Sequence, residues 1–508
     1  MDWMLEKKER QKIELLTYLK RQIQGEISVK EIGEALSWSK YLVLTVASEL
    51  VADLTSIYGE EQTADKSLQL SADEKKLLLS LKRHVNVDAV MLVYLRESLY
   101  WNFIKEVFLE TVTSYEEFAE RYLTTPSTTR NVKNHLAERL APLGIGIDDH
   151  YHFTGDESAI RMFFFRLAVR YFGDREFPYG EQLKQQADEG IDRLVASFTA
   201  EPFIRDSKRI ALRFYYALAA IRVREGHFVD PHNLDDIFVP THDMAPTTQA
   251  LLAEMVADSL QYDTINADQA AVEARETLYY LYILNVVGST DWEHIISPKM
   301  QQRIQAIMTI VADYHQRYFG VGMTLASATQ IRRELLAPVL MFELHAIDVG
   351  HRRYFDMEEA YRMYPVLVEM AINVSRDIAP LRDLTPEESE RLMFGYLFTA
   401  FAAYLDQADI FAPIKIDIDI TYRPALEVIL KRMLAGMAEF NIVFTNRFED
   451  NVDLVISDAM LAEVDSRNRF DWQQLPTIKQ IAQLRSRLSV IKRQKFEARF
   501  KELNPEND

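Results

Sequence analysis

Cysteine is absent from this 508-residue chain, and glycine and proline are scarce, with 16 of each. Without cysteine there are no disulfide bonds, no thiolate metal sites and no cysteine nucleophiles. So little glycine and proline argues against a β-sandwich, a collagen-like repeat or a low-complexity chain. No apolar run reaches the length of a membrane span, because the richest stretch, Met162 to Phe172, is interrupted by Arg166 and Arg170. What remains, 48% hydrophobic and 27% charged residues, is the balance of a globular protein.

Positive charge is also in deficit. The formal net charge is -19, which argues against a chain that coats nucleic acid or an anionic membrane over its whole surface. A local basic face is still compatible with this charge, because screening limits the field to roughly 10 Å at about 0.1 M salt. The first residues, MDWMLEKKERQK, lack the pattern of a secretion signal, so we expect a cytoplasmic protein without membrane attachment.

Helical periodicity dominates the chain, in runs such as Leu212 to Val223, Leu335 to Ile347 and Leu392 to Leu405. The clearest alternating strand is Ile414 to Ile420, in which every second residue is isoleucine. Shorter strand candidates are Ile442 to Phe444, Leu454 to Ile456 and a ribbon from Gly146 to Phe153. We therefore expect a mainly α-helical protein with α/β character at its C-terminal end.

Residues 113 to 155 carry the pattern of a winged helix-turn-helix. Ser114 is expected to cap a short helix, Thr124-Thr125-Pro126 breaks it, and Ser127 is the candidate cap of a second helix that Gly144 ends. A hairpin wing is expected from Ile145 to Phe153, with His150 and His152 near its tip.

The second helix of this unit is predicted to face a duplex. Val132, Leu136 and Leu140 define its buried stripe, and no Asp or Glu occurs from Arg121 to Ala137. The outer or flanking surface then offers donors and acceptors suited to phosphates and base edges. The candidate DNA-contacting residues of this helix are Ser127, Thr128, Thr129, Arg130, Asn131, Lys133 and Asn134. The competing interpretation is an ordinary helical hairpin with an uncharged surface.

A similar layout occurs nearer the N-terminus. Ser28 is expected to cap a helix through Ile32 and Ala35, a turn follows at Ser37 to Ser39, and the next helix spans Lys40 to Leu54. That helix is strongly apolar, and Lys40 is its one basic residue. It is suited to packing against a neighbour, and Lys40 is its candidate DNA contact.

Two histidines follow long apolar helices in matching contexts, His227 after Gly226 and His351 after Gly350. This faint repeat predicts two related helical bundles. A histidine at such a position either is an ordinary surface residue that offsets the helix dipole or is open to phosphorylation.

Taken together, the chain resembles the Mga/AtxA family of transcriptional regulators from Gram-positive bacteria. The resemblance rests on the domain order over essentially the whole length. Its most specific part is Ser127-Thr128-Thr129-Arg130 through Leu140, then Gly144-Ile145, and Phe153 to Arg161 with its G-x-E-x-x-I-R pattern. It implies two winged helix-turn-helix units (1–70 and 71–158), two helical bundles like PTS regulation domains, or PRDs (159–290 and 291–412), and an EIIB-like α/β domain (413–508).

The resemblance also implies partners and sites. Such proteins bind double-stranded DNA, activate virulence or metabolic genes, and dimerise through the C-terminal domain. Their bundles can be phosphorylated on histidine by the phosphocarrier protein of the sugar phosphotransferase system, which makes His227, His351 and His345 the candidates here. The helix Met393 to Asp406, where some relatives carry a further histidine, has none, and the EIIB-like loop at 421–424 lacks the active cysteine.

Two alternatives are open on the residues alone. His242-Asp243 and the cluster His345, Asp348 and His351 fit a helical metal-dependent phosphohydrolase of the HD type, although the spacing is not that of ligands on one helix face. The other is a phosphorelay sensor whose helix-turn-helix units only pack. Walker, dinucleotide and G-x-S-x-G motifs are missing, so we expect a regulator and not an enzyme, with no cofactor or metal.

Overall fold

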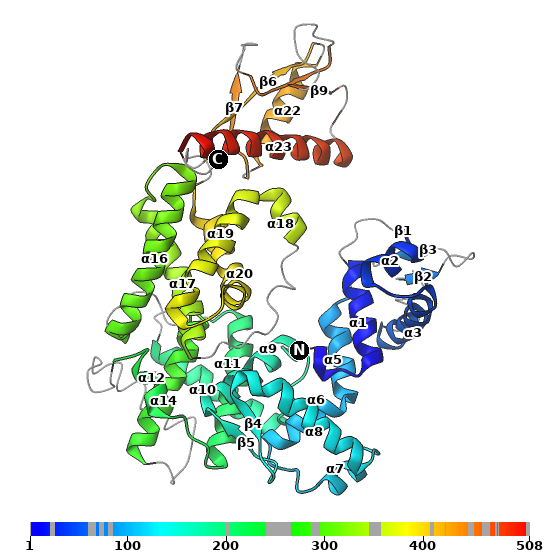
Figure 1. The fold of residues 1–508 in the computed structure, drawn as a ribbon, viewed down its shortest axis with the longest axis vertical. Helices are drawn as coiled ribbons and strands as arrows, with labels where there is room; N and C mark the ends of the chain where they lie inside the picture. Colours follow the sequence, from blue (N-terminus) through cyan, green and yellow to red (C-terminus); the bar gives the residue numbers. More distant parts are fainter. Residues whose placement is uncertain are drawn as a thin grey trace. The chain divides into compact units, whose positions relative to one another are not determined.

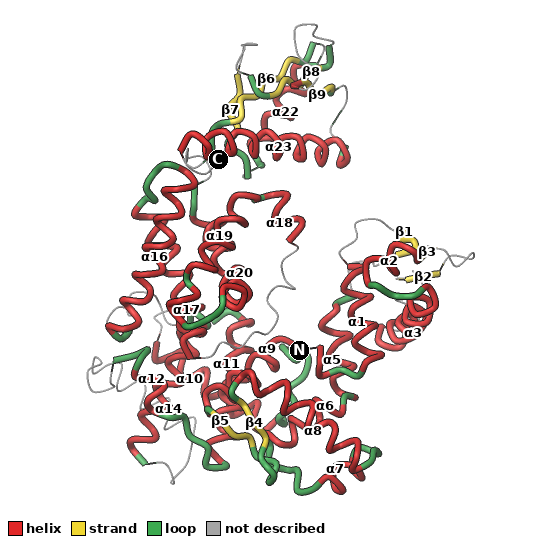
Figure 2. Tube along the Cα trace, in the orientation of Figure 1, coloured by secondary structure: helices red, strands yellow, loops and turns green. Residues whose placement is uncertain are grey.

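The computed structural model is mainly α-helical, which confirms the fold class expected from the periodicity. It describes residues 2–20, 26–58, 68–70, 76–79, 85–198, 204–239, 266–286, 295–344, 357–406, 411–421, 423–437, 439–445, 452–459, 468–472, 475 and 477–503. The chain divides into two compact units, one of Met1–Ser297 with Leu344–Gly350 and one of Pro298–Glu343 with His351–Asp508. Figure 1 labels the elements, and Figure 2 shows the described strands gathered in three small groups.

The first unit begins with three helices and a three-stranded sheet, in the segment where the first helix-turn-helix was predicted. Ser28 starts the second helix through a capping box, in which its hydroxyl accepts the Glu31 amide and the Glu31 carboxylate accepts the Ser28 amide, each at 3.0 Å. Ser37 ends that helix with a left-handed φ of 57°. The elements are α1 (Lys7–Lys20), β1 (Glu26–Ser28), α2 (Val29–Leu36), α3 (Lys40–Tyr58), β2 (Leu68–Leu70) and β3 (Lys76–Leu79), with the antiparallel strand order β1-β3-β2.

A second winged helix-turn-helix follows, built on two linking helices. Ser98 both ends the first linking helix and caps the next, by accepting the Trp101 amide. The hairpin wing pairs Ile147 with Phe153 and Ile145 with Gly155. The elements are α5 (Val87–Glu97), α6 (Leu99–Phe108), α7 (Tyr115–Arg121), α8 (Pro126–Leu140), β4 (Ile145–Ile147) and β5 (Phe153–Gly155).

The rest of the first unit is a helical bundle around α9 (Glu157–Tyr171), which is buried on all sides over most of its length. Asp156 caps α9 by accepting the amides of Ser158 and Ala159. A helix without an exposed face must satisfy its polar groups internally, and α9 does so through the network described below. Its neighbours are α10 (Glu181–Phe198), α11 (Asp206–Arg224), α12 (Pro231–Asp235) and α14 (Ala267–Ile283).

The second unit contains another set of helices and the α/β domain. Thr385 begins α20 through a capping box with Glu388. Glu343 near the end of α17 accepts ion pairs from Arg303 and Arg382, which joins three segments. The helices are α16 (Pro298–Phe319), α17 (Leu325–Leu344), α18 (Met357–Met363), α19 (Pro365–Asp377) and α20 (Pro386–Tyr404).

The C-terminal domain is a parallel sheet of strand order β7-β6-β8-β9, packed with two helices. The isoleucines predicted to share one face of β6 are buried, from Ile414 at 1% exposed to Ile420 at 8%. The predicted strands at 442–444 and 454–456 are confirmed, whereas β9 was not expected. The elements are β6 (Ile414–Asp419), α22 (Pro424–Ala435), β7 (Ile442–Thr445), β8 (Leu454–Ser457), β9 (Arg469–Asp471) and α23 (Ile478–Leu503).

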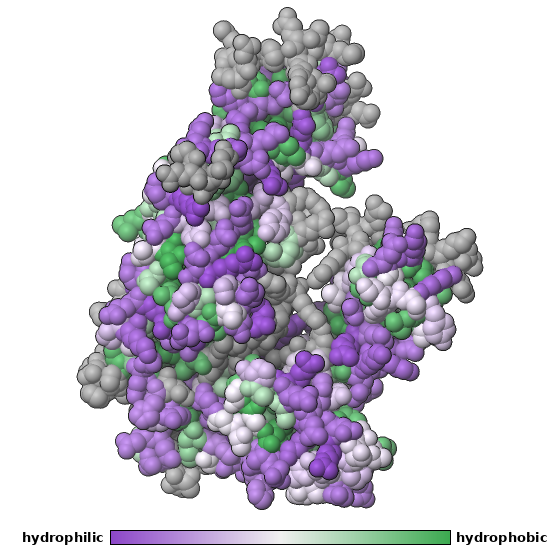
Figure 3. Space-filling model, in the orientation of Figure 1, coloured by the Kyte–Doolittle hydropathy of each residue, from purple (hydrophilic) through white to green (hydrophobic). Residues whose placement is uncertain are grey.

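Among the described residues one helix, α3, is long and apolar enough to cross a membrane by length and composition. It also packs against α1 and α2, and its Val43, Val46 and Leu50 lie in the core of the first helix-turn-helix. A core helix has the same composition as a membrane span, so packing accounts for its apolar character. On the face drawn in Figure 3, hydrophilic residues cover most of the described surface, with smaller apolar patches among them.

Candidate nucleic-acid interface

The two helices of the second helix-turn-helix are joined by a turn that local chemistry dictates. Ser114 caps α7 by accepting the Glu117 amide at 3.1 Å, as predicted. Leu123 ends it with a φ of 50°. The cap of α8 is Thr125, which accepts the Thr128 amide at 3.1 Å, and Pro126 takes the first helical position. The prediction of Ser127 as the cap was therefore wrong, because proline is itself favoured in the first turn and the helix begins two residues earlier.

The buried side of α8 is the predicted one. Val132 is 3% exposed and Leu136 and Leu140 are fully buried, and α8 packs against α6 and α7. Phe118 of α7 enters the same core and meets Phe103 edge to face at 5.1 Å between ring centroids. This packing fixes which side of α8 is turned outward.

Four of the candidate DNA-contacting residues lie exposed on that outward side, and Thr128 beside them is half-buried. The exposed residues are Ser127, Arg130, Asn131 and Asn134. They come from the first nine residues of α8, and the N-terminal part of such a helix is the part that contacts base edges in helix-turn-helix proteins. These four residues present one guanidinium, two amides and a hydroxyl to solvent, and the exposed acidic residue of α8, Glu138, lies nearer its C-terminal end.

The remaining two candidates on α8 are buried, so their expected place on a DNA-facing surface was wrong. Thr129 is fully buried, and its hydroxyl donates to the Thr125 carbonyl at 3.2 Å. Lys133 is 8% exposed, and its ammonium donates to the Asp148 carbonyl at 2.7 Å and lies 5.2 Å from the ring centre of Tyr151. The wing folds back over this flank of α8, and Lys133 ties helix and wing together.

The wing turn is organised by Asp148. Its carboxylate accepts the amides of His150 and His152, both at 2.8 Å. Partial burial works against the charge, but these amides and the nearby imidazoles lower the pKa of Asp148 below its ordinary value. Gly155 at the base of the wing has a φ of 119°, and a Cβ there would collide with the Gly144 carbonyl oxygen, so only glycine closes the hairpin.

Lys40, the candidate DNA contact of the first predicted helix-turn-helix, is exposed at the start of α3. Tyr41 beside it is 79% exposed. The helix then turns small, uncharged residues outward, with Ser48 and Ala52 among the exposed ones. The exposed surface of α3 therefore offers few side chains that could hydrogen-bond to bases, unlike the exposed arginine and asparagines of α8.

Of the phosphorylation candidates, only His227 lies among the described residues. It follows the C-terminal end of α11 and Gly226, as predicted, and its side chain is 30% exposed. Its Nε2 makes a 2.5 Å contact with Glu110 Oε1. His345 and His351 lie outside the described residues, as do His242, Asp243 and Asp348 of the hydrolase alternative. Within the described part of the chain no cluster of His, Asp and Glu could hold a metal ion.

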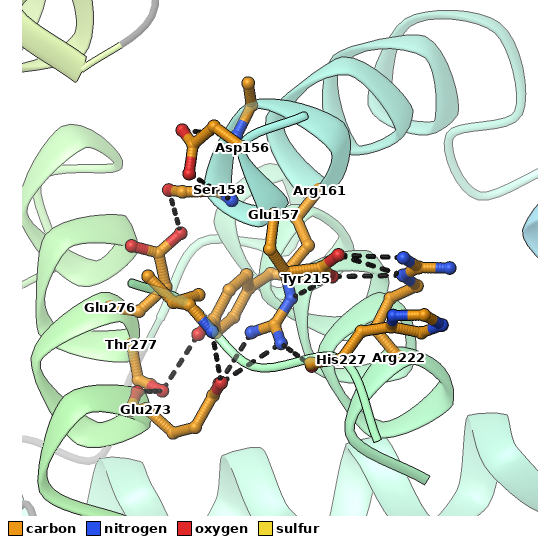
Figure 4. A network of polar contacts seen from close by, with 12 residues as sticks. Asp156, Glu157, Ser158, Arg161, Tyr215, Arg222, His227, Glu273, Glu276 and Thr277 are labelled. Carbon is orange, nitrogen blue, oxygen red and sulfur yellow. Dashed lines mark hydrogen bonds and ion pairs between the residues drawn. The ribbon is translucent and has the colours of Figure 1, made fainter. Parts of the chain in front are cut away.

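His227 borders a buried charge network in the first bundle, drawn in Figure 4. Arg161 is fully buried and donates to Glu157 at 2.9 Å and to Glu273 at 2.6 and 3.1 Å. It also donates to the His227 carbonyl at 3.0 Å. Arg222 pairs with the other side of Glu157, at 2.8 Å. The network thus connects the start of α9 with α11, α14 and the loop of His227.

Burial sets the protonation of this network. Burial lowers the pKa of Arg161, but Glu273 and Glu157 outweigh this effect and hold it well above its ordinary value. Burial raises the pKa of Glu276 to about 8, although the Ser158 hydroxyl and Arg161 act in the opposite direction. The Ser158 hydroxyl donates to Glu276 Oε1 at 2.6 Å. Glu276 is therefore largely neutral near pH 7, beside a fully charged arginine.

Sequence reasoning missed Glu110, Glu273 and Glu276 as parts of a site. A signal was present for Glu157 and Arg161, which are oppositely charged and four residues apart in a strongly apolar helix. Glu110 in the turn after α6 and the two glutamates of α14 are distant along the chain, and no local pattern points to them.

Comparison with known proteins agrees with the position of this interface. No curated protein matches the chain. Residues 83–168 match the family described as the Mga helix-turn-helix domain. The matched segment contains α5 to α8, the wing and most of α9, and so includes every exposed candidate residue of α8. The resemblance to Mga-type regulators is thereby confirmed for this segment, and residues 83–168 form a helix-turn-helix domain of the Mga type.

Proposed function

We propose that the protein is a cytoplasmic DNA-binding regulator that activates transcription of virulence or metabolic genes. The observation that carries this proposal is the outward face of α8, where Arg130, Asn131 and Asn134 are exposed beside a wing, within the matched domain. Arginine is suited to phosphate or guanine, and asparagine to adenine. In this proposal α8 enters the major groove and Lys40 of the first helix-turn-helix adds a backbone contact.

The net charge of the chain makes the number of contacts important. At -19, each subunit is repelled from DNA at long range, and few cations face outward on α8. Two subunits on one duplex would double the phosphate contacts and raise the apparent affinity by linking two binding events. We therefore place dimerisation beside DNA binding in the function.

The C-terminal domain is the proposed dimer contact. Its strand β7 is at the edge of the sheet, and Val443 on it is 43% exposed. Val428 and Ile429 of α22, which packs on β7, are 48% and 42% exposed. Val443→Glu should then lower the molar mass measured by light scattering toward that of one chain, whereas Val321→Glu, at a 39% exposed site outside this domain, should leave it unchanged.

Control by phosphorylation is proposed at His227. A phosphoryl group there would add about -1.5 to -2 charge next to Arg222 and the buried network. Incubation with phosphorylated phosphocarrier protein should label wild type and His232→Ala but not His227→Ala. His232 is the matched control because it lies in the same bundle and its side chain is 87% exposed. Labelling of the His227→Ala variant would place the modification elsewhere.

The experiment that tests the function itself is genome-wide mapping of bound DNA. Wild type should occupy discrete promoters, and the Arg130→Ala, Asn134→Ala double variant should lose them. Arg493→Ala is the matched control, since Arg493 is a 67% exposed arginine on α23. Equal occupancy by wild type and the double variant would contradict the assignment of α8 as the DNA-reading helix.

A further inference from the structure

Glu110 occupies an unusual position between two parts of the first unit. It follows α6 and precedes α7, and its φ of 53° is rare for a residue with a side chain. The turn is held by the Glu110 amide, which donates to the Val107 carbonyl at 3.2 Å, and by the Thr111 amide, which donates to the Glu106 carbonyl at 2.9 Å. The two hydrogen bonds fix the backbone of this turn, and the contacts of the carboxylate itself place the side chain between the bundle and the wing.

On the bundle side, this carboxylate meets two cations or potential cations. His227 Nε2 lies 2.5 Å from Glu110 Oε1, and Arg222 Nη1 lies 3.6 Å from the same oxygen. Arg222 is 1% exposed, and its Nη1 is buried without a hydrogen-bond partner among the described residues. The Arg222 guanidinium also lies 5.5 Å from the ring centre of Phe108, two residues before Glu110. His227 and Arg222 thus both lie against the turn that follows α6.

On the other side, Glu110 faces the wing of the DNA-binding domain. Glu110 Oε2 lies 3.8 Å from His152 Nε2. His152 belongs to the wing turn, where its amide donates to Asp148. The wing in turn holds Lys133 of α8 through the Asp148 carbonyl. One carboxylate thus connects the bundle histidine with the wing, and the wing with the DNA-facing helix.

We propose that Glu110 is a positioning residue that transmits the charge state at His227 to the wing of the second helix-turn-helix. Negative charge at His227 repels Glu110 and competes with it for Arg222 Nη1, which offers an unused donor. The Glu110 side chain then moves away from His227 and loses its contact with His152. Without this contact the wing is held less firmly against α8. The proposal rests on the proposed function for its natural trigger, a phosphoryl group on His227, but the coupling itself needs no DNA and no phosphate.

A double-mutant cycle in the full-length protein tests the coupling. His227→Glu places a carboxylate next to Glu110, and Glu110→Gln removes the charge that would respond to it. The readout is hydrogen exchange of the wing amides of residues 148–152, measured without DNA. We expect His227→Glu to speed this exchange about 5- to 10-fold when Glu110 is present, and by less than about 2-fold in the Glu110→Gln background.

Two controls separate the coupling from simple damage. His232→Glu adds the same charge at an exposed site of the same bundle and should leave wing exchange unchanged. Amides in the middle of α11 should exchange equally in wild type and His227→Glu, since a disrupted bundle would speed them as well. Equal acceleration by His227→Glu in both backgrounds, or none in either, would overturn the proposal. Failure of the phosphocarrier to label His227 would instead count against the proposed function and leave the coupling result standing.

Discussion

Replacement of Arg161 with methionine should destabilise the first bundle, because it leaves a buried carboxylate without its main partner. Glu157 keeps its ion pair with Arg222 at 2.8 Å. Glu273, only 2% exposed, is left with the Val229 amide at 3.2 Å as a donor. Removal of one partner from a buried ion pair costs about 3–5 kcal/mol, because the other charge stays desolvated. We therefore expect the free energy of unfolding of the bundle to fall by about 4 kcal/mol.

Hydrogen exchange of the α9 amides in the full-length protein measures this change locally, where a global transition of a multidomain chain would mix several units. The matched control is Arg209→Met, which removes a surface pair whose partners are 30% and 65% exposed and should cost about 0–1 kcal/mol. Adding Glu273→Gln to Arg161→Met should recover part of the stability. A cost below about 1 kcal/mol, or no recovery in the double variant, would refute the reasoning.

Three further predictions concern single positions. The pKa of Glu276 rises from 4.5 to about 8 on folding, so between these pH values the native state holds a proton that the unfolded state has released. Wild-type stability, measured by thermal unfolding, should therefore fall as the pH rises from 4.5 to about 8. Glu276→Gln should flatten this pH dependence. Gly155→Ala should open the wing and cost more than about 1 kcal/mol, seen as faster exchange of the wing amides, because its Cβ meets the Gly144 carbonyl. Trp3→Ala should cost about 2 kcal/mol and speed exchange in α8, because the Trp3 ring packs beside His135 of α8 and stacks on Phe163 of α9.

Each of these three predictions has a control, or a result that would contradict it. A wild-type stability that stays level from pH 5 to about pH 8 would show that Glu276 is not held neutral. Gly180→Ala is the control for Gly155→Ala, since Gly180 also has a positive φ but open space around it. Equal destabilisation by the two variants would mean that backbone strain, and not the collision with the Gly144 carbonyl, causes the effect. Tyr41→Ala, at an exposed aromatic, is the control for Trp3, and a neutral Trp3→Ala would mean that the N-terminal residues do not brace α8.

Local patterns predicted the elements well where neighbouring residues determine them. The caps at Ser28 and Ser114, the apolar stripe of α8 and the isoleucine alternation of β6 are all present. Each depends on residues within about two turns or one strand. The predicted domain boundaries stay predictions, as does every DNA contact and phosphorylation site.

Contacts between distant residues could not be predicted in this way. Lys133 has the helical phase of a flanking surface residue, and only the folded wing shows that it is enclosed. β3 pairs with β1, which lies far away along the chain. The apolar residues of β3 do not by themselves determine which of its residues lie opposite those of β1. Glu110 and His227 are 117 residues apart, and neither stands out in its own segment. Burial of the charged network likewise depends on α11 and α14 packing around α9.

The salt dependence of DNA binding tests the central claim, that the exposed face of α8 docks on a duplex, most directly. With a DNA fragment recovered by genome mapping, Arg130→Ala should weaken binding and lower the slope of log affinity against log salt by about 0.9 for each phosphate that the variant no longer neutralises. Asn134→Ala should instead leave that slope unchanged and reduce discrimination between bases by about 1–3 kcal/mol. An affinity, slope and base preference identical to wild type in both variants would contradict the account.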